Sequence, residues 1–256
     1  MQSKGVFGTI LNYMGIFSGK TDNLVKDLFS VGAHFGYSKS RRHPSARSVI
    51  FGAKNKLELI DLEETAKYIE RVKEFAEGLG KAGKMILFVS GKTEARKAIK
   101  EVANRIGMPY VAGRWVGGTL TNFDEIRSRV NKLVSLREQK EKGELSKYTK
   151  KERLMIDREI ERLEAMYNGI VCMDSKPHAL FVVDTNAEKS AVREAKRLSL
   201  PIMSISGTDC DLTIPEYPIP ANDKNGETIA YILGIIVDAY EEGLKDAPQK
   251  VSKKEN

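Results

Sequence analysis

The tripeptide Gly91-Lys92-Thr93 follows an apolar run and precedes a helical pattern, which is the setting of a phosphate-binding loop. Such a loop needs a first glycine five residues before the second, because successive backbone amides must wrap around the phosphates. Ile86 stands at that position. The spacing therefore disfavours a nucleoside triphosphate, although the amides that begin the helix, together with Lys92, could still bind one phosphate of an RNA backbone.

Groups for acid–base or metal chemistry are few. His34 lies between small residues, which indicates a packed ring, and His178 has no acid at a suggestive local spacing. Asp184 ends one apolar run, and Asp209 and Asp211 follow another, so these carboxylates could meet at one sheet edge and bind a divalent ion. Carboxylates that cap loops and helices are commoner. The sequence therefore predicts no catalytic group, no metal and no cofactor, and a protein that is not an enzyme.

Chemistry suited to RNA is concentrated in three segments. Residues 38–44 form a basic loop with hydroxyl groups and no acid, and residues 54–56 repeat the basic pattern. Residues 113–122 contain the only tryptophan, Trp115, beside an arginine and before two glycines, which would let the chain approach a backbone and stack on bases. A lone tryptophan is, however, more often a core anchor. The residues predicted to bind RNA are Lys39, Arg41, Arg42, Arg47, Lys54, Lys56, Lys92, Arg114, Asn122, Lys147, Lys150 and Lys151.

The distribution of charge agrees with a polyanionic partner. The chain of 256 residues has a formal net charge of +7, and residues 1–60 hold nine Lys and Arg against three acids. Each cation that meets a phosphate releases a condensed counterion, which favours binding, although charge alone is equally compatible with a solvated basic face. The two cysteines, Cys172 and Cys210, have no metal-ligand spacing, as is typical of a reducing compartment.

The ends of the chain and the absence of long apolar stretches bear on location. No stretch is long enough to cross a bilayer, and residues 1–20 lack the features of a signal or transit peptide. We therefore expect a cytoplasmic protein with no membrane partner. Residues 1–22 are expected to be an N-terminal extension, and residues 245–256 a flexible tail.

Strands and helices alternate over most of the chain, and these elements must position the polar segments. Apolar runs predict strands, and apolar residues at three- and four-residue steps predict helices. The expected strands are 48–51, 85–90, 110–112, 179–184 and 202–205, and the expected helices run from Asp61 or Thr65 to about Gly80 and over 93–106, 187–198 and 227–244. This alternation predicts an α/β domain with a parallel sheet, built from residues 23–120 and 168–244.

Residues 121–167 interrupt this alternation. Two sets of apolar residues there recur at the steps of a coiled-coil seam, with a polar turn around Gly143 between them. The first set is Ile126, Val130 and Leu133, and the second is Ile156, Ile160, Leu163 and Tyr167. The pattern predicts an inserted antiparallel helical hairpin, a coiled coil with its tip at 141–149. Two ordinary amphipathic helices packed on the sheet are the alternative.

Several ordered motifs resemble one known family. They are Gly32-Ala33-His34-Phe35-Gly36, Phe51-Gly52-Ala53-Lys54-Asn55-Lys56, Ile60-Asp61-Leu62-Glu63-Glu64-Thr65, the segment from Arg114 to Phe123, the segment from Lys176 to Asp184, and Ile219-Pro220-Ala221-Asn222-Asp223. Together they make the chain similar to the small-subunit ribosomal protein two family, bacterial type, from about Asn23 to Leu244.

This resemblance implies a flavodoxin-like three-layer α/β domain with an inserted helical hairpin. It also implies a structural constituent of the small ribosomal subunit that binds ribosomal RNA near the head–body junction and contacts other ribosomal proteins. The large mRNA-binding ribosomal protein one is implied as a further partner, and no homo-oligomer is expected. A flavodoxin-like nucleotide-binding enzyme remains the alternative function.

Overall fold

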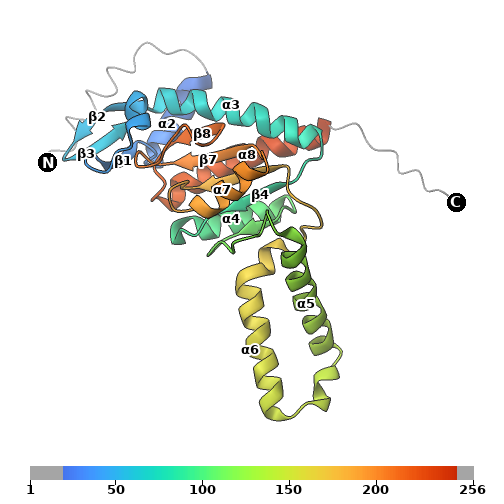
Figure 1. Cartoon of the computed structure of the whole chain (residues 1–256). Helices are drawn as coiled ribbons and strands as arrows, with labels where there is room; N and C mark the ends of the chain where they lie inside the picture. Colours follow the sequence, from blue (N-terminus) through green and yellow to red (C-terminus); the bar gives the residue numbers. More distant parts are fainter. Residues whose placement is uncertain (1–19, 247–256) are drawn as a thin grey trace.

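The computed structural model describes residues 20–246, and its largest element is a five-stranded parallel sheet (Figure 1). The order is β5-β4-β6-β7-β8, with every neighbouring pair parallel. The strands are β4 (Ile86–Val89), β5 (Tyr110–Val111), β6 (Ala179–Val183), β7 (Ile202–Ser206) and β8 (Tyr217–Pro220). Counted along the chain this order is 2-1-3-4-5, the arrangement of flavodoxin-like folds.

Helices cover both faces of this sheet, which makes three layers. One buried cluster joins Ile86, Phe88 and Phe181 to α2 (Lys20–Ser30), α3 (Leu62–Lys81), α4 (Thr93–Arg105) and α8 (Gly226–Asp246). A second cluster joins Leu87 and Val182, from the opposite face, to α7 (Lys189–Arg197). Strands buried on both faces read as continuous apolar runs, and all four residues of β4 are buried. The predicted α/β class and parallel sheet are therefore confirmed.

Two details of the predicted sheet were wrong or missing. Residues 48–51 do not complete the parallel sheet. Instead β2 (Ile50–Lys54) pairs with β3 (Leu57–Ile60) in a separate antiparallel sheet that also contains β1 (Phe35–Ser38). The fifth parallel strand is β8, which the sequence had not indicated. Its Pro218 and Pro220 cannot donate to a ladder, and they are tolerated because β8 is an edge strand.

The four helices predicted for the sheet domain, α3, α4, α7 and α8, begin and end close to the predicted positions, whereas α2 had not been predicted. Asp61 caps α3, because its carboxylate accepts hydrogen bonds from the amides of Glu63 and Glu64. α2 begins at Lys20, inside the predicted extension 1–22, and most of that extension and of the predicted tail 245–256 lies outside the described residues. None of the described helices combines the length and apolar character needed to cross a membrane.

Residues 123–167 form two helices that lie side by side and project from the sheet domain (Figure 1). They are α5 (Phe123–Glu141) and α6 (Lys150–Tyr167), linked by a segment that contains η2 (Glu144–Lys147). Ion pairs of 2.6 Å between Lys132 and Glu159 and of 2.7 Å between Lys140 and Asp157 cross from one helix to the other. The apolar residues between the two helices are continuous with the second sheet cluster.

Candidate nucleic-acid interface

The predicted basic loop connects β1 to η1 (Pro44–Val49) and is fastened to the segment that follows β7. The backbone amides of Tyr37 and His43 donate to the hydroxyl and carbonyl oxygens of Thr208, each at 2.9 Å. Lys39 and Arg41 are exposed, and the Arg41 guanidinium lies 5.1 Å from the centre of the Tyr37 ring. The loop therefore presents exposed cations on a backbone that is held in place by hydrogen bonds to Thr208.

Arg42 differs from Arg41 because its charge is already paired. Its Nη1 donates to Glu58 Oε1 at 3.0 Å, and Glu58 is only 2% exposed. Removing one partner of a buried ion pair costs about 3–5 kcal/mol, because the other charge is left uncompensated. Arg42 therefore holds Glu58 inside the protein and is less available to a phosphate than the sequence suggested.

The turn between β2 and β3 presents a second set of cations. Asn55 and Lys56 have φ angles of 52° and 66°, and two successive left-handed residues form the tight turn that suits a two-residue hairpin. Lys54 and Lys56 are exposed, and neither forms an ion pair with any residue from 20 to 246. Phe51, in the same hairpin, is 73% exposed. The turn therefore offers unpaired charge, and the same hairpin also carries an exposed aromatic ring.

The segment with the only tryptophan is organised by one carboxylate, that of Glu194 on α7. Its Oε1 accepts from Trp115 Nε1 at 3.0 Å and from the Gly118 amide at 2.8 Å. Its Oε2 accepts from the amides of Leu120 and Thr121 at 3.0 and 3.2 Å, and from the Thr121 hydroxyl at 3.1 Å. Trp115 is 8% exposed, so the core-anchor interpretation of this residue fits the structure. Burial by itself raises the pKa of Glu194, but these hydrogen bonds outweigh burial and lower it.

Replacing Glu194 by alanine is expected to destabilise the protein by about 3 kcal/mol or more, because several buried donors lose their acceptor. Glu194→Gln, which keeps one acceptor oxygen, should cost less. The lowered pKa means that this stabilisation is present above the ordinary value of 4.5 and is lost as pH falls through the folded-state pKa. Fluorescence of Trp115 during urea unfolding measures both effects, and equal midpoints for Glu194→Ala and the parent would contradict the assignment.

Arg114 and Asn122 remain exposed at the two ends of this segment. Asn122 is the N-cap residue of α5, but its side chain makes no capping hydrogen bond. The amide of Asn122 and the guanidinium of Arg114 are therefore available to an external partner at the root of α5.

The cations predicted at the far end of the two long helices are also exposed. Lys147 lies 5.4 Å from the centre of the Tyr148 ring, while Lys150 and Lys151 occupy the first turn of α6. Positive charges at a helix N-terminus oppose the helix dipole, which costs a few tenths of a kcal/mol. An external anion would remove that cost.

The carboxyl ends of β4 and β6 form the topological switch point, where flavodoxin-like proteins bind their ligands. Here the Gly91 amide donates to Glu188 Oε1 at 2.6 Å, and Glu188 is buried. A Cβ on residue 91 would lie 2.7 Å from that oxygen, so glycine is needed for the approach. The chain's own carboxylate thus uses the backbone donor that a phosphate would need.

Lys92 belongs to the same internal network, and its internal partners argue against the RNA contact predicted for it. Its Nζ lies 2.7 Å from Asp184 Oδ2 and 2.7 Å from Asp223 Oδ2, and the three side chains are 16%, 7% and 0% exposed. Burial by itself lowers the pKa of Lys92, but the two carboxylates outweigh burial and raise it. The ammonium group is therefore already neutralised inside the protein.

The carboxylates expected to meet at one sheet edge do so only in part. Asp184 lies in a group with Cys210 and Asp223, whose ligand atoms are all within 4.8 Å of one another. Asp211 instead lies with its Oδ1 3.8 Å from His43 Nδ1. Burial raises the pKa of the Cys210 thiol, which opposes the thiolate form that binds metals. Lys92 bridges the two carboxylates where a cation would otherwise sit.

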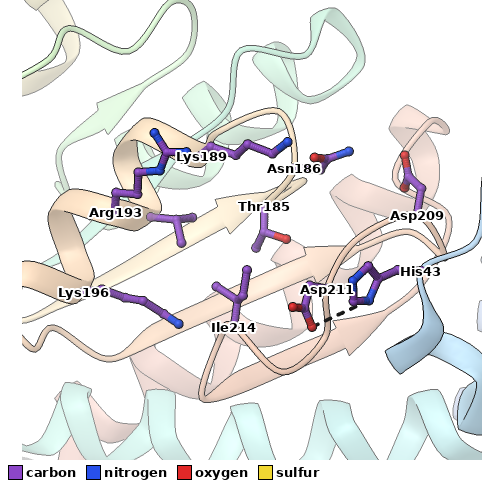
Figure 2. A pocket seen from close by; sticks show the side chains of 10 residues that line it. His43, Thr185, Asn186, Lys189, Arg193, Lys196, Asp209, Asp211 and Ile214 are labelled. Carbon is purple, nitrogen blue, oxygen red and sulfur yellow. Dashed lines mark ion pairs between the residues drawn. The ribbon is translucent and has the colours of Figure 1, made fainter.

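A cleft of about 350 Å³ lies between α7 and the segments that follow β6 and β7 (Figure 2). Three of its lining residues are exposed cations on α7, namely Lys189, Arg193 and Lys196. Their spacing of four and three residues, which is visible in the sequence, places them on one helix face. His43 also lines the cleft, so the cleft adjoins the basic loop.

The predicted residues do not form one patch. The basic loop and the β2–β3 turn lie at one end of the molecule, and residues 147–151 lie at the far tip of α5 and α6 (Figure 1). Asn122 is the N-cap residue of α5 where that helix leaves the sheet domain, and Arg114 lines a small hollow with Glu164 and Asn168 near the end of α6. A partner that touches all three places must be large.

Comparison with known proteins identifies the family to which this chain belongs. The family model described as Ribosomal protein S2 matches residues 28–243. The small ribosomal subunit protein uS2 of Coprothermobacter proteolyticus is 41% identical over 219 residues, which cover 86% of this chain and 82% of that protein. The uS2 proteins of Mycobacteroides abscessus and Acidothermus cellulolyticus are each 41% identical over 221 residues, covering 86% of this chain and 80% of theirs. The chain therefore belongs to the ribosomal protein S2 family.

Proposed function

We propose that this protein is a structural constituent of the cytoplasmic small ribosomal subunit, where it binds ribosomal RNA and neighbouring ribosomal proteins without catalysing a reaction. The observation that carries this proposal is the family match over residues 28–243, together with relatives that are named as small-subunit proteins. The separated clusters of exposed cations support it, because ribosomal RNA is a polyanion large enough to meet all of them.

The proposed RNA contacts are the predicted residues whose charges are free of internal ion pairs among residues 20–246. Phosphate contacts need cations that are exposed and not already neutralised. They are Lys39, Arg41, Arg47, Lys54, Lys56, Arg114, Lys147, Lys150 and Lys151, with Asn122 as a neutral contact. Arg42 and Lys92 are assigned to internal ion pairs instead.

We further propose that residues 121–167 are an inserted antiparallel coiled-coil hairpin that serves as a contact module. The sheet domain would then consist of residues 23–120 and 168–244, with 1–22 as an extension and 245–256 as a tail. The projecting pair of helices, its cross-helix ion pairs and its exposed tip support this division. The large mRNA-binding ribosomal protein one is proposed as a further partner on the strength of the family resemblance.

The alternative function, a flavodoxin-like nucleotide-binding enzyme, is not supported. Family membership favours a ribosomal protein. In addition, the switch point carries three buried carboxylates from Asp184, Glu188 and Asp223, and Lys92 is the one cation within residues 20–246 that forms ion pairs with any of them. A phosphate placed there would meet net negative charge and an occupied amide donor.

Co-sedimentation with small ribosomal subunits tests the proposed function, and the basic loop provides a quantitative variant. The double variant Lys39→Gln with Arg41→Gln should weaken binding to small-subunit ribosomal RNA whatever the RNA sequence. The slope of log affinity against log salt concentration should become shallower by about two units, one per lost phosphate contact. Lys67→Gln with Arg71→Gln on α3 removes the same charge elsewhere and should leave the slope unchanged. Equal slopes for the two double variants would refute this use of the loop.

A further inference from the structure

The cleft between α7 and the segment after β7 has two walls of opposite charge. Lys189, Arg193 and Lys196 form one wall, and Asp209 and Asp211 stand on the other (Figure 2). The floor between them is formed by residues such as Thr185, Val192 and Ile214. The cleft is therefore not uniformly basic like the loop beside it, and it has an apolar base.

The three cleft-lining cations on α7 are not neutralised by acids in the described part of the chain. None of Lys189, Arg193 and Lys196 forms an ion pair with a residue between 20 and 246. Like charges three and four residues apart on a helix cost a few tenths of a kcal/mol each. Lys189 also stands in the first turn of α7, where the helix dipole disfavours a cation. An anion bound in the cleft would remove both costs.

The acids on the other wall are not equivalent. Asp211 accepts hydrogen bonds from the amide and hydroxyl of Thr213 at 3.0 and 2.7 Å, so it is used to shape its own loop. Asp209 is half-buried, and the hydrogen bond it accepts among described residues is a weak one, 3.8 Å from the Cys210 thiol. Asp209 is left with oxygen atoms available for donors from a ligand.

A ligand that suits this cleft must carry negative charge at one end and N–H donors at the other. An unpaired RNA nucleotide has both, because its phosphates are anionic and its base edge offers amino or imino groups. A cleft of about 350 Å³ is also within the usual range for small ligands, about 300–1,000 Å³. A bare phosphate would be attracted by α7 but repelled by the two aspartates.

We propose that this cleft binds one unpaired nucleotide of the ribosomal RNA. Its sugar–phosphate backbone lies along Lys189, Arg193 and Lys196, and N–H groups of its base edge donate to Asp209. The inference rests on the proposed function, since it assumes that ribosomal RNA is the partner. It adds a subsite in which the base is read, whereas the basic loop meets phosphates alone.

Binding of the full chain to small-subunit ribosomal RNA, measured at several salt concentrations, tests the basic wall. Arg193→Gln with Lys196→Gln should lower the salt slope by about two units. The α3 pair Lys67→Gln with Arg71→Gln is the charge-matched control and should leave the slope at the parent value. All four side chains are exposed, so both double variants should fold like the parent. Thermal melts of the two variants check this.

A single substitution on the acidic wall separates a nucleotide from a phosphate. Asp209→Asn should weaken RNA binding roughly tenfold if the carboxylate accepts from a base edge. If the cleft holds only phosphates, removing this negative charge should strengthen binding, and the proposal is then wrong. Asp246 is an exposed acid at the end of α8 that does not line the cleft, so Asp246→Asn should change the affinity little.

The outcomes distinguish this inference from the proposed function. If the parent protein does not co-sediment with small subunits, the proposed function fails. If the parent binds but the cleft variants match the α3 control, the ribosomal assignment survives and the cleft proposal fails. Variants that keep full RNA affinity but lose a neighbouring ribosomal protein would show that the cleft is a protein-docking surface, which also overturns the proposal.

Discussion

Replacing Lys92 by methionine should lower the free energy of unfolding by about 3–5 kcal/mol, the cost of breaking a buried ion pair on one side. The Lys92 ammonium is the cation that contacts both Asp184 and Asp223, at 2.7 Å each, and these carboxylates are 7% and 0% exposed. Without it the two acids face each other uncompensated, and Asp223 already has one buried oxygen, Oδ1, without a hydrogen-bond partner among the described residues. Urea denaturation of the parent and the variant measures the difference.

Two controls separate this internal role from a role in binding RNA. Lys97→Met removes a lysine from α4, the helix that follows Lys92 directly; the Lys97 side chain is 88% exposed, and its loss should change stability by less than about 0.5 kcal/mol. Lys92→Arg keeps the charge and should retain part of the stability. If Lys92→Met unfolds at the parent urea concentration but loses affinity for RNA, Lys92 contacts RNA as its sequence context had suggested.

Two members of this network, Asp184 and Lys92, should make the stability of the protein depend on pH, each in a direction that follows from its pKa shift. Burial by itself raises the pKa of Asp184, but Lys92 and the Ala187 amide outweigh burial and lower it below the ordinary value of 3.8. Its stabilisation is therefore present above pH 3.8 and lost as pH falls through the lower folded-state pKa. The raised pKa of Lys92 gives stabilisation that is present below pH 10.5 and lost only at more alkaline pH. Both effects should vanish in Lys92→Met. Asp223 differs from Asp184, because in the parent its burial outweighs the contact with Lys92 and raises its pKa.

Elements with a strong local pattern were predictable from the sequence. β4, β6 and β7 are short apolar runs, and α3 begins at a residue, Asp61, whose side chain caps it. β8 was missed because Pro218 and Pro220 argue against a strand, and only its position at the sheet edge makes them acceptable. The predicted strand 48–51 was placed in the wrong sheet for a related reason, since β2 (50–54) pairs with β3 instead. This pairing depends on the left-handed turn at Asn55 and Lys56, and the dipeptide lacks the glycine that usually marks such turns.

In the candidate site, the exposed charges were predictable from the sequence and the paired charges were not. That Lys39, Arg41 and Lys54 are exposed follows from polar local sequence, and the structure places all three at the surface. The pairing of Lys92 could not be predicted, because Asp223 is 131 residues away in the chain. Glu194 was also missed, since its donors lie more than 70 residues earlier and nothing local marks its carboxylate as buried. Long-range partners decide which cations remain available.

Removing the outer part of the long helices should leave a folded protein that joins small subunits poorly. Residues 134–158 contain one buried apolar side chain, Leu145, which lies in the tip itself. A Gly/Ser linker of about four residues can join 133 to 159, because packed helices lie about 8–10 Å apart. The Lys132–Glu159 ion pair shows that the two cut ends are level with each other.

A deletion of residues 124–166 provides the comparison, because it also removes the root of both helices. Ile126, Val130 and Leu163 there belong to the same buried cluster as Leu87 and Val182 of the sheet. The outer deletion should therefore melt cooperatively, within a few degrees of the parent, whereas the longer deletion should be less stable because it exposes part of the sheet core. Incorporation into small subunits should fall in both, since both lose Lys147, Lys150 and Lys151. If the outer deletion itself unfolds the sheet domain, the two helices are part of the core. If it is incorporated like the parent, the tip makes no contact that assembly requires.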